Sequence, residues 1–333
     1  MIYYKKNEDR KLMKLISINQ IEEARARIQP YVRPTETSES LELSTRLRAK
    51  ICLKWENCQV TGSFKIRGAS NKILANLNDC RKKGVVTAST GNHGRAVAQV
   101  CRQEKLALSI YVPASLSEIK RKKLEDNKVN LVVVNGPCQQ AESLARKEAA
   151  LAGQMYVSPY NDEQVIAGQG TCGLEILRDW PEVEEIIVPV GGGGLIAGIA
   201  VYIKEKRPQV RITGVEPKNS AFIKHSLSVG RISNDFIEKL TIAEAVAGGL
   251  EENTVTFSLI ERYVDDLLTV DEESILQAIK VIHSYHQQKA EGAGALSLAA
   301  VLSYPRLFSG KKILAVVSGG NIDVHHWSKI VSS

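Results

Sequence analysis

Short runs of β-forming residues alternate with stretches of helical periodicity along most of this 333-residue chain. This alternation predicts βαβ units, and therefore an α/β fold in which helices cover both faces of a mostly parallel sheet. The length is sufficient for one large or two modest domains. The predicted strands lie at 83–89, 106–112, 130–136, 155–159, 185–190, 211–217 and 311–319. The predicted helices between them are GRAVAQVCRQE, SEIKRKKLEDN, CQQAESLARKEAALAG and LIAGIAVYIKEKRP.

The two flanking regions are less regular. INQIEEARARI near the start has the spacing of a helix, and extended chain follows it up to about residue 50. Residues 225–270 give no clear assignment, but the next stretch, VDEESILQAIKVIHSYH, is typical of a helix capped by an aspartate. We find no tandem repeat and no low-complexity linker, so a second domain would be an insertion built from the same kind of unit.

Charge is spread over the chain and does not form a binding face. The 44 Lys and Arg residues against 37 Asp and Glu give a formal net charge of +7. Basic residues alternate with acids, and even the densest basic cluster, IKRKKLEDNK at 119–128, contains acids. No aromatic side chains accompany a basic stripe. We therefore expect a solvated surface and no nucleic-acid partner.

The cysteines and the longest apolar run indicate the cellular compartment of the protein and whether it associates with a membrane. Six cysteines show no CxxC spacing, and the N-terminal MIYYKKNEDRKLMK lacks an apolar signal core. Both features favour reduced thiols in a cytoplasmic protein. The uncharged run at 186–203 has the length of a membrane span, but a proline and four glycines interrupt it. A buried strand, a loop and a buried helix explain this run better, so we expect no membrane association.

The stretch VPVGGGGLIAGIA predicts a phosphate-binding loop between a strand and a helix. Four residues without Cβ, Gly191 to Gly194, allow several N–H groups to converge on one anion at the positive end of the helix dipole. The same stretch satisfies GxGxxG/A through Gly192, Gly194 and Ala197, and Glu216 follows at the end of the next strand. Taken alone, this motif leaves a dinucleotide-dependent oxidoreductase open.

Two further loops follow predicted strands. VVTASTGNHGRAVAQV offers short hydroxyl and amide side chains and free backbone N–H groups that suit a carboxylate; its loop residues are Ser89, Thr90, Gly91, Asn92 and His93. In AVVSGGNID, Ser318 stands at a strand end and could donate one hydrogen bond to a ligand ring atom, or simply cap the next element. Parallel sheets bind ligands at this edge of the strands.

Lys65, in TGSFKIRGA, adjoins the apolar face of a predicted helix at its first turn, with Thr61 and Ser63 available as caps. Burial and the helix dipole both lower the pKa of a lysine in this position and favour the neutral, nucleophilic amine. The local sequence alone also fits a surface lysine with a partly covered stem. The apolar face consists of Ile66, Ala69, Ile73, Leu74 and Leu77.

Four motifs together resemble one enzyme family. KWENCQVTGSFKIRGA, STGNHGRAVA, VPVGGGGLIAG and VVSGGN, in this order and at these separations, resemble the serine/threonine dehydratase and serine racemase family of fold type II pyridoxal 5'-phosphate enzymes. The resemblance runs from about residue 20 to 325. It implies a fold like that of the tryptophan synthase β chain, with two open, twisted, mostly parallel sheets. It also implies a large domain (1–59 and 158–333), a small domain (60–157) and the cofactor in the cleft between them.

The resemblance implies a role for each motif. Lys65 would bind the cofactor covalently, with Phe64 beside the ring and Asn92 at the ring hydroxyl. Ser318 would face the pyridine nitrogen, where a serine disfavours a long-lived carbanion. The substrate carboxylate would lie in the loop Ser89 to His93, and Lys65 would then act as general base. The phosphate would be bound by Gly191, Gly192, Gly193, Gly194 and Leu195.

The implied activity is that of an ammonia-lyase, a homodimer that converts a small β-hydroxy amino acid such as threonine or serine to a 2-oxo acid and ammonia. Amino-acid racemisation stays open because Thr90 occupies a position where racemases of the family have serine and many dehydratases have alanine. GNHGRAVA and LEENTVTFSLI look more like the branch tied to hydroxyectoine breakdown and to diaminopropionate ammonia-lyase. A hydroxylated diamino acid is therefore an alternative substrate that the resemblance implies. A dinucleotide-dependent oxidoreductase is the remote alternative.

We expect no metal. Members of the family bind a cation through a glutamate, a carbonyl and an aspartate; here Glu216 is present but Phe222 stands in place of the aspartate. His283 with His286, and the pair His325 and His326, lack an acid or cysteine that would complete a metal site. We expect these histidines to be solvated. Glu291, in AEGAGALS, is expected to support the cofactor site from a helix start.

Overall fold

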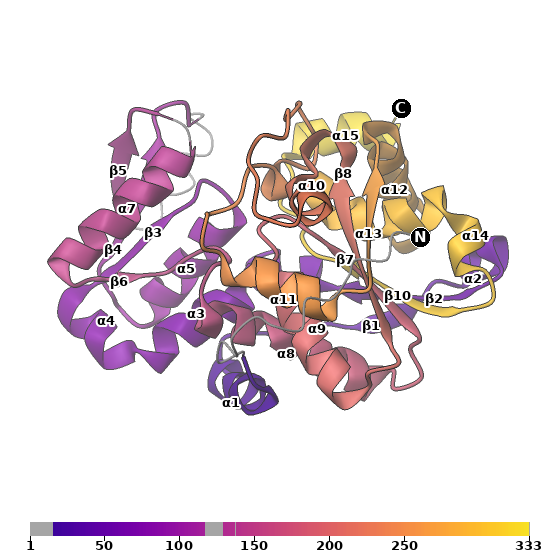
Figure 1. Ribbon diagram of the computed structural model, residues 1–333, viewed down its shortest axis with the longest axis horizontal. Coiled ribbons are helices and arrows are strands. Elements are labelled where there is room, and N and C mark those ends of the chain that lie inside the picture. Colours follow the sequence, from indigo (N-terminus) through magenta and orange to yellow (C-terminus); the bar gives the residue numbers. More distant parts are fainter. Residues whose placement is uncertain (1–15, 117–128, 137, 333) are drawn as a thin grey trace.

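The computed structural model describes residues 16–116, 129–136 and 138–332. The predicted helix at 119–128 lies outside these residues. Within them, two mostly parallel sheets are flanked by helices (Figure 1), which confirms the predicted α/β fold class. Each of the seven predicted strands is present, although the one predicted at 155–159 is confined to Met155–Tyr156.

The larger sheet has six strands in the order β1-β2-β10-β7-β8-β9. Within the described residues, β1 is the one strand that pairs antiparallel, and it pairs with β2. The strand β9 falls in the region that the sequence left unassigned. The strands are β1 Thr37–Glu39, β2 Lys50–Trp55, β7 Glu185–Pro189, β8 Arg211–Pro217, β9 Asp266–Val270 and β10 Lys312–Val317.

Alternate residues of β10 show how this sheet is covered on both faces. Ile313, Ala315 and Val317 pack in one apolar cluster, whereas Leu314 and Val316 pack in another. The first cluster includes side chains of α2 (Leu41–Leu47), α12 (Glu272–His286), α13 (Gly292–Ser303), α14 (Pro305–Phe308) and α15 (Val324–Ser332). The second includes side chains of α8 (Glu163–Asp179), α9 (Gly194–Lys206), α10 (Phe222–Val229) and α11 (Val255–Tyr263). Continuous burial explains why the strands are apolar throughout.

The smaller sheet has four strands in the order β5-β4-β3-β6, and all its pairs are parallel. Its strands are β3 Val85–Ala88, β4 Leu108–Pro113, β5 Asn130–Val134 and β6 Met155–Tyr156. One face packs on α3 (Lys65–Ala75), α4 (Leu77–Lys83) and α5 (Asn92–Gln103), and the other on α7 (Cys138–Ala152). We propose that this sheet and its helices form the small domain expected at 60–157.

Helix boundaries follow local chemistry in several places. Ser17 and Gln20 form a capping box at the start of α1 (Ile18–Ile28). The carboxylate of Asp271 accepts the N–H of Ser274, which confirms the predicted aspartate cap of α12. The described residues also form three short 3-10 helices: η1 Glu56–Cys58, η2 Lys218–Ser220 and η3 Glu244–Val246.

The run at 186–203 consists of β7, the glycine loop and most of α9, as predicted. In the part of the chain that the structure describes, no helix has both the length and the apolar character that a membrane span requires.

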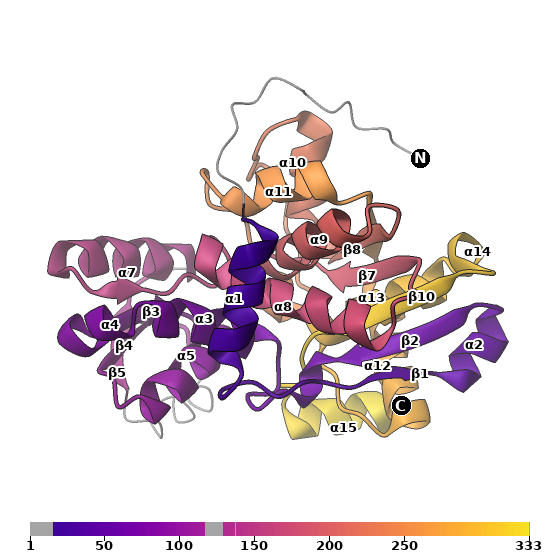
Figure 2. The same cartoon turned by 90° about the horizontal axis from the view of Figure 1, so that it is seen from below.

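The two sheets meet where α1, α3, α8 and α9 lie against one another (Figure 2). Glycines permit this close approach. A Cβ on Gly168 of α8 would lie 2.6 Å from the carbonyl oxygen of Arg67 in α3. A Cβ on Gly198 of α9 would lie 2.5 Å from the backbone nitrogen of Gly170 in α8. The helix α8 is therefore in backbone contact with a helix from each side of the junction.

We expect Gly198→Ala to lower the free energy of unfolding by about 1–3 kcal/mol, because the added methyl overlaps backbone that cannot move aside. Gly173→Ala is the matched control: it also lies in a buried helix, but its Cβ would lie 3.3 Å from Ile199. Both changes gain the same helix propensity, so they differ only in steric overlap. Gly173→Ala should therefore lower the free energy of unfolding far less than Gly198→Ala. Denaturant unfolding of the two variants measures the difference, and equal midpoints would contradict the close contact between α8 and α9.

Candidate active site

A single cavity of about 890 Å³ brings together every site residue that the sequence predicts. It lies at the carboxyl ends of strands from both sheets: Ser89 follows β3, Gly191 follows β7 by one residue, and Ser318 follows β10. This edge is where open parallel sheets bind ligands. The predicted residues in its lining are Phe64, Lys65, Ser89, Thr90, Gly91, Asn92, His93, Gly191, Gly192, Gly193, Gly194, Leu195 and Ser318.

Lys65 is the first residue of α3, and its side chain reaches into the cavity. The ammonium donates a hydrogen bond to the carbonyl oxygen of Pro159 at 2.8 Å. Burial lowers the pKa of Lys65 to about 8, while the charges of Glu142 and Glu291 oppose that shift. The amine is still mostly charged near neutral pH, but its uncharged fraction is far larger than that of an ordinary lysine, as a nucleophile or base requires.

The predicted capping of α3 is wrong. The residue before the helix is Phe64, and the hydroxyl groups of Thr61 and Ser63 are buried without a hydrogen bond to any described residue. The helix start is fixed by the backbone instead, because the N–H of Phe64 donates to the carbonyl of Ser318 at 3.1 Å. This bond and the pairing of Ser63 with Gly319 join the lysine segment to the end of β10.

The glycine loop leads from β7 into α9, which begins at Gly194. Gly193 has φ +85°, a conformation that favours glycine. A Cβ on Gly192 would lie 2.3 Å from the ring of Tyr160, and the carbonyl of Gly192 accepts a hydrogen bond from Thr256 at 2.7 Å. Only a loop of this composition fits between the aromatic ring and the cavity, and it leaves backbone N–H groups at a helix N-terminus for an anion.

The loop at 89–93 leads from β3 into α5. His93 is buried, and its Nε2 donates to the carbonyl of Val157 at 3.0 Å. Burial, reinforced by the charge of Lys65, lowers the pKa of His93 to about 3, so the imidazole is neutral. His93 therefore fixes the loop. Ser89 and Thr90 remain half-buried, and Gly91 is exposed.

Asn92 is held by side chains from the other sheet. Its Nδ2 donates to Oε1 of Glu291 at 2.6 Å, and its Oδ1 accepts from Asn321 at 2.7 Å. Asn321 in turn accepts from Arg95 at 2.8 Å. Glu291 precedes α13 and also donates its backbone N–H to Gly319. Glu291 therefore lies in the cavity lining in contact with Asn92, and its support of the cofactor stays a prediction.

Ser318 is buried, with its hydroxyl 3.5 Å from the carbonyl of Ala293, to which it donates. That carbonyl is the one partner of the hydroxyl among the described residues, and the bond is long. No helix starts at Ser318, so the alternative role as a cap is not realised.

Several lining residues were not singled out from the sequence. Arg95 lies within the quoted GNHGRAVA, where its i+3 position after Asn92 could have signalled a shared face. Tyr160 and Glu142 belong to no motif. Their contribution depends on how β6 and α7 fold over the cavity, which periodicity does not reveal.

Glu216, considered above as a ligand of a ribose or a cation, has neither role here. Its two carboxylate oxygens accept the N–H groups of Ile223 and Lys224, each at 2.9 Å, so it caps α10. Phe222 is buried against Phe236, with ring centroids 5.2 Å apart. Because both oxygens of Glu216 are engaged and an aromatic side chain stands at the second position, the donor set does not fit a cation.

The candidate histidines are also structural. His283 packs edge-on against Trp327, and His286 contacts the hydroxyl of Ser40 at 2.9 Å. Both are half-buried, which corrects the expectation that they are solvated; His325 and His326 are exposed as expected. Among the described residues, no three His, Cys, Asp or Glu side chains are arranged to hold a metal ion.

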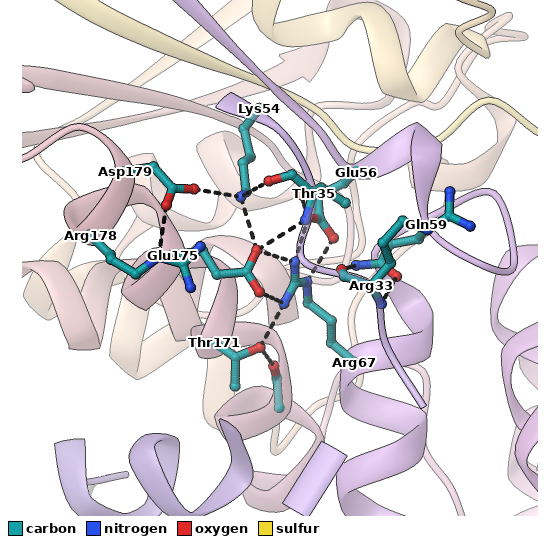
Figure 3. Close-up of polar contacts among 11 residues, drawn as sticks. Arg33, Thr35, Lys54, Glu56, Gln59, Arg67, Thr171, Glu175, Arg178 and Asp179 are labelled. Carbon is teal, nitrogen blue, oxygen red and sulfur yellow. Dashed lines mark hydrogen bonds and ion pairs between the residues drawn. The ribbon is translucent and has the colours of Figure 1, made fainter. Parts of the chain in front are cut away.

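A buried ionic network is centred on Arg67 (Figure 3). Arg67, two residues after Lys65 in α3, is fully buried and pairs with Glu56 at 2.7 Å and Glu175 at 2.8 Å. Lys54, also fully buried, pairs with Glu175 at 2.9 Å. Burial opposes ionisation of Glu175, but Arg67 and Lys54 outweigh it and lower its pKa to about 2. The network joins α3 to β2, η1 and α8 by charge-assisted bonds.

The comparison with known protein families agrees with this site. The model of the family described as "Pyridoxal-phosphate dependent enzyme" matches residues 28–319. The chain belongs to this family. This membership gives no support to the remote alternative, a dinucleotide-dependent oxidoreductase.

Similar pyridoxal-phosphate dependent proteins cover nearly the whole chain. An L-threonine ammonia-lyase of Thermotoga maritima is 40% identical over 319 residues, which are 96% of this chain and 79% of the relative. The catabolic L-threonine dehydratase TdcB of Staphylococcus aureus is 36% identical over 324 residues, 95% of this chain and 92% of the relative. The solved structure of maize serine racemase is 33% identical, covers 95% of this chain and 98% of its own, and superposes with a TM-score of 0.87.

The cofactor of this family is pyridoxal 5'-phosphate, and the cavity fits it. The buried amine of Lys65, with its lowered pKa, suits reaction with the aldehyde of the cofactor. The glycine loop at the N-terminus of α9 suits its phosphate. The long hydrogen bond of Ser318 leaves a buried hydroxyl for a ring atom.

We expect Lys65 in the cofactor-free protein to react with trinitrobenzenesulfonate with a midpoint near pH 8, because its pKa is lowered to about 8 and only the neutral amine reacts. Mass spectrometry of the peptide that contains Lys65 measures the rate at each pH. N-acetyl-lysine is the reference, for which the midpoint should lie near the ordinary lysine value of 10.5. A Lys65 midpoint that coincides with the reference would contradict a desolvated amine.

We expect Arg67→Met to lower the free energy of unfolding by about 3–5 kcal/mol, because it leaves Glu56 and Glu175 buried without their cation. Arg81→Met is the control: Arg81 also pairs with a glutamate, Glu104 at 2.9 Å, but its side chain is 55% exposed. An exposed pair contributes about 0–1 kcal/mol. Urea unfolding measures the free energy of unfolding of both variants. A decrease for Arg67→Met no larger than that for Arg81→Met would show that the buried network does not stabilise the fold.

Proposed function

We propose that this protein is a pyridoxal-phosphate dependent ammonia-lyase that converts a small β-hydroxy amino acid to a 2-oxo acid and ammonia. The observation that carries the proposal is the position of Lys65, a buried amine of lowered pKa in one cavity with loops suited to a phosphate, a carboxylate and a ring nitrogen. The names of the threonine ammonia-lyase and threonine dehydratase relatives support it.

Each loop has a proposed role. The backbone N–H groups of Gly191 to Leu195 bind the phosphate, and Phe64 packs beside the ring. Asn92 and Ser318 orient the ring through its hydroxyl and its nitrogen. The bound cofactor supplies an electron sink for the α-carbon. The loop from Ser89 to His93 receives the substrate carboxylate, and neutral His93 keeps its backbone in place.

Lys65 is proposed to act twice. It holds the cofactor before the substrate binds, and its freed amine then removes the α-proton. Its pKa of about 8 leaves a working fraction of neutral base at physiological pH. Departure of the β-hydroxyl as water leaves an enamine, whose hydrolysis gives the 2-oxo acid and ammonia. The net reaction removes ammonia alone and needs no oxidant.

Racemisation is the second candidate, and one observation favours it. Thr90 is half-buried and lines the cavity within the loop from Ser89 to His93. A proton donor on the second face of the substrate would return the α-proton with inverted configuration. The solved serine racemase that this chain resembles supports an activity of this kind beside elimination.

The cellular location and the oligomeric state are also proposals. We propose a cytoplasmic location, supported by five described cysteines that are free thiols. We propose a homodimer on the family resemblance, and sedimentation analysis of the purified protein tests it.

We expect the purified protein to absorb visible light through its cofactor, and Lys65→Ala to lose both this absorbance and 2-oxo acid release. Lys82→Ala, an exposed lysine on the next helix, should keep both. The measurement is a screen of 2-oxo acid release over serine, threonine, hydroxyaspartate and hydroxylated diamino acids, with chiral analysis for racemisation. A colourless wild-type protein that binds a nicotinamide cofactor would refute the lyase.

A further inference from the structure

The glycine loop depends on its neighbours for its shape. A glycine has no side chain to restrict its backbone, and it loses more conformational freedom than any other residue when it is ordered. Surrounding elements must therefore fix this loop if its N–H groups are to converge on one anion. Thr256 of α11 donates to the carbonyl of Gly192 at 2.7 Å, and a Cβ on Gly191 would lie 2.9 Å from Cα of Val246 in η3.

Tyr160, in the segment between β6 and α8, forms a further wall of the loop. A Cβ on Gly192 would lie 2.3 Å from Cγ of Tyr160, and a Cβ on Gly194 would lie 3.3 Å from its Cβ. Neither glycine has a positive φ, so its backbone conformation is open to other residues. At position 192 it is therefore the aromatic ring that requires glycine, and the ring determines where the loop can run.

The ring is itself held in place. Tyr160 is only 9% exposed, and its hydroxyl accepts the backbone N–H of Glu251 at 3.0 Å. The carboxylate of Glu251 accepts from Arg146 of α7 at 2.6 Å and from Asn161 at 2.6 Å. Two of these three contacts reach Glu251 from consecutive residues, and the third comes from a helix of the smaller sheet. Tyr160 is therefore a fixed surface against which a flexible loop can be ordered.

We propose that Tyr160 is a positioning residue for the cofactor, because its ring holds the glycine loop in the conformation that binds the phosphate. This inference rests on the proposed function, which assigns the phosphate to that loop. The preceding residue, Pro159, accepts the hydrogen bond of Lys65 at 2.8 Å. Adjacent residues thus contact the amine and the loop that the proposed function assigns to the aldehyde and the phosphate. Without the ring, the loop gains conformational freedom, and binding must then restrict it.

Two ligands that differ only in the phosphate measure this role. Equilibrium dialysis of the full-length protein, after removal of its cofactor, gives a Kd for pyridoxal 5'-phosphate and a Kd for pyridoxal. We expect the wild-type protein to bind the phosphorylated ligand at least ~100-fold more tightly, from charge-assisted hydrogen bonds to the loop. Tyr160→Ala should reduce this preference at least ~10-fold. A general loss of stability would weaken both ligands alike and leave the preference unchanged.

Two control variants isolate the ring. Tyr202→Ala removes an equally buried tyrosine, 8% exposed, from α9, the helix that the glycine loop begins. Tyr202 does not line the cavity, so this variant should keep the wild-type preference. Tyr160→Phe keeps the ring, and Glu251 keeps its contacts with Arg146 and Asn161, so this variant should also keep the preference.

A substitution in the loop tests the same contact without removing the ring. Gly192→Ala places a methyl in the space of Tyr160, so the loop must move, and the preference should fall at least ~10-fold. In the Tyr160→Ala background the methyl has room. Gly192→Ala should then cause no further decrease, because residues in contact give non-additive effects. If Tyr160→Ala does not fold, Gly192→Ala alone decides.

The outcomes separate this inference from the lyase. If Tyr160→Ala and Gly192→Ala keep the wild-type preference, the inference is overturned and the phosphate loop stands. If the wild-type protein binds both ligands equally, the loop binds no phosphate, and the inference is overturned with it. The preference does not depend on turnover. A protein that shows the expected preferences but releases no 2-oxo acid would therefore refute the lyase and support the role of Tyr160.

Discussion

The arrangement of the active site depends on the buried pairing of Arg67 with Glu56 and Glu175. A guanidinium without access to water is tolerated only if its donors meet acceptors in one geometry. Here those acceptors come from η1 and α8, and Lys54 of β2 completes the charge balance. The first turn of α3 is therefore bound directly to η1 and α8, and through Glu175 to Lys54 of β2. Because Lys65 lies in that same turn, the position of the reactive amine is determined by charges that never contact a ligand.

Close helix contact acts together with these charges. The glycines of α8 and α9 bring backbones into van der Waals contact, and α8 also supplies Glu175 and Thr171 to Arg67. One helix thus carries both the steric and the ionic connection between the two sheets. The cavity forms where the loops of both sheets meet in front of this helix. Burial of Lys65 and His93, and the lowered pKa of each, follow from that position.

Features encoded in neighbouring residues could be predicted from the sequence, and features that need distant partners could not. Strand and helix periodicity located the sheets, and the glycine, Ser89–His93 and Ser318 loops all reached the same cavity. The caps proposed for α3 were wrong because a backbone bond from Phe64 to β10, distant in sequence, replaces them. Glu216, which the sequence offered only as part of a competing motif or an incomplete cation site, caps α10 with both carboxylate oxygens. Arg67 and Glu142 gave no signal, since one needs partners about 100 residues away and the other needs the fold of α7 over the cleft.

In the proposed role of Asn92 at the ring hydroxyl, its contacts would influence the ionisation of the cofactor. Arg95 can only donate, so the amide oxygen of Asn321 must face it, and the amide nitrogen of Asn321 then faces the oxygen of Asn92. The nitrogen of Asn92 is thereby turned toward Glu291, with one hydrogen used and one left. The guanidinium of Arg95 thus determines which group donates in each hydrogen bond from Asn321 to Asn92 and from Asn92 to Glu291. A ring oxygen that meets the remaining hydrogen must accept it, and a phenolate accepts more strongly than a phenol.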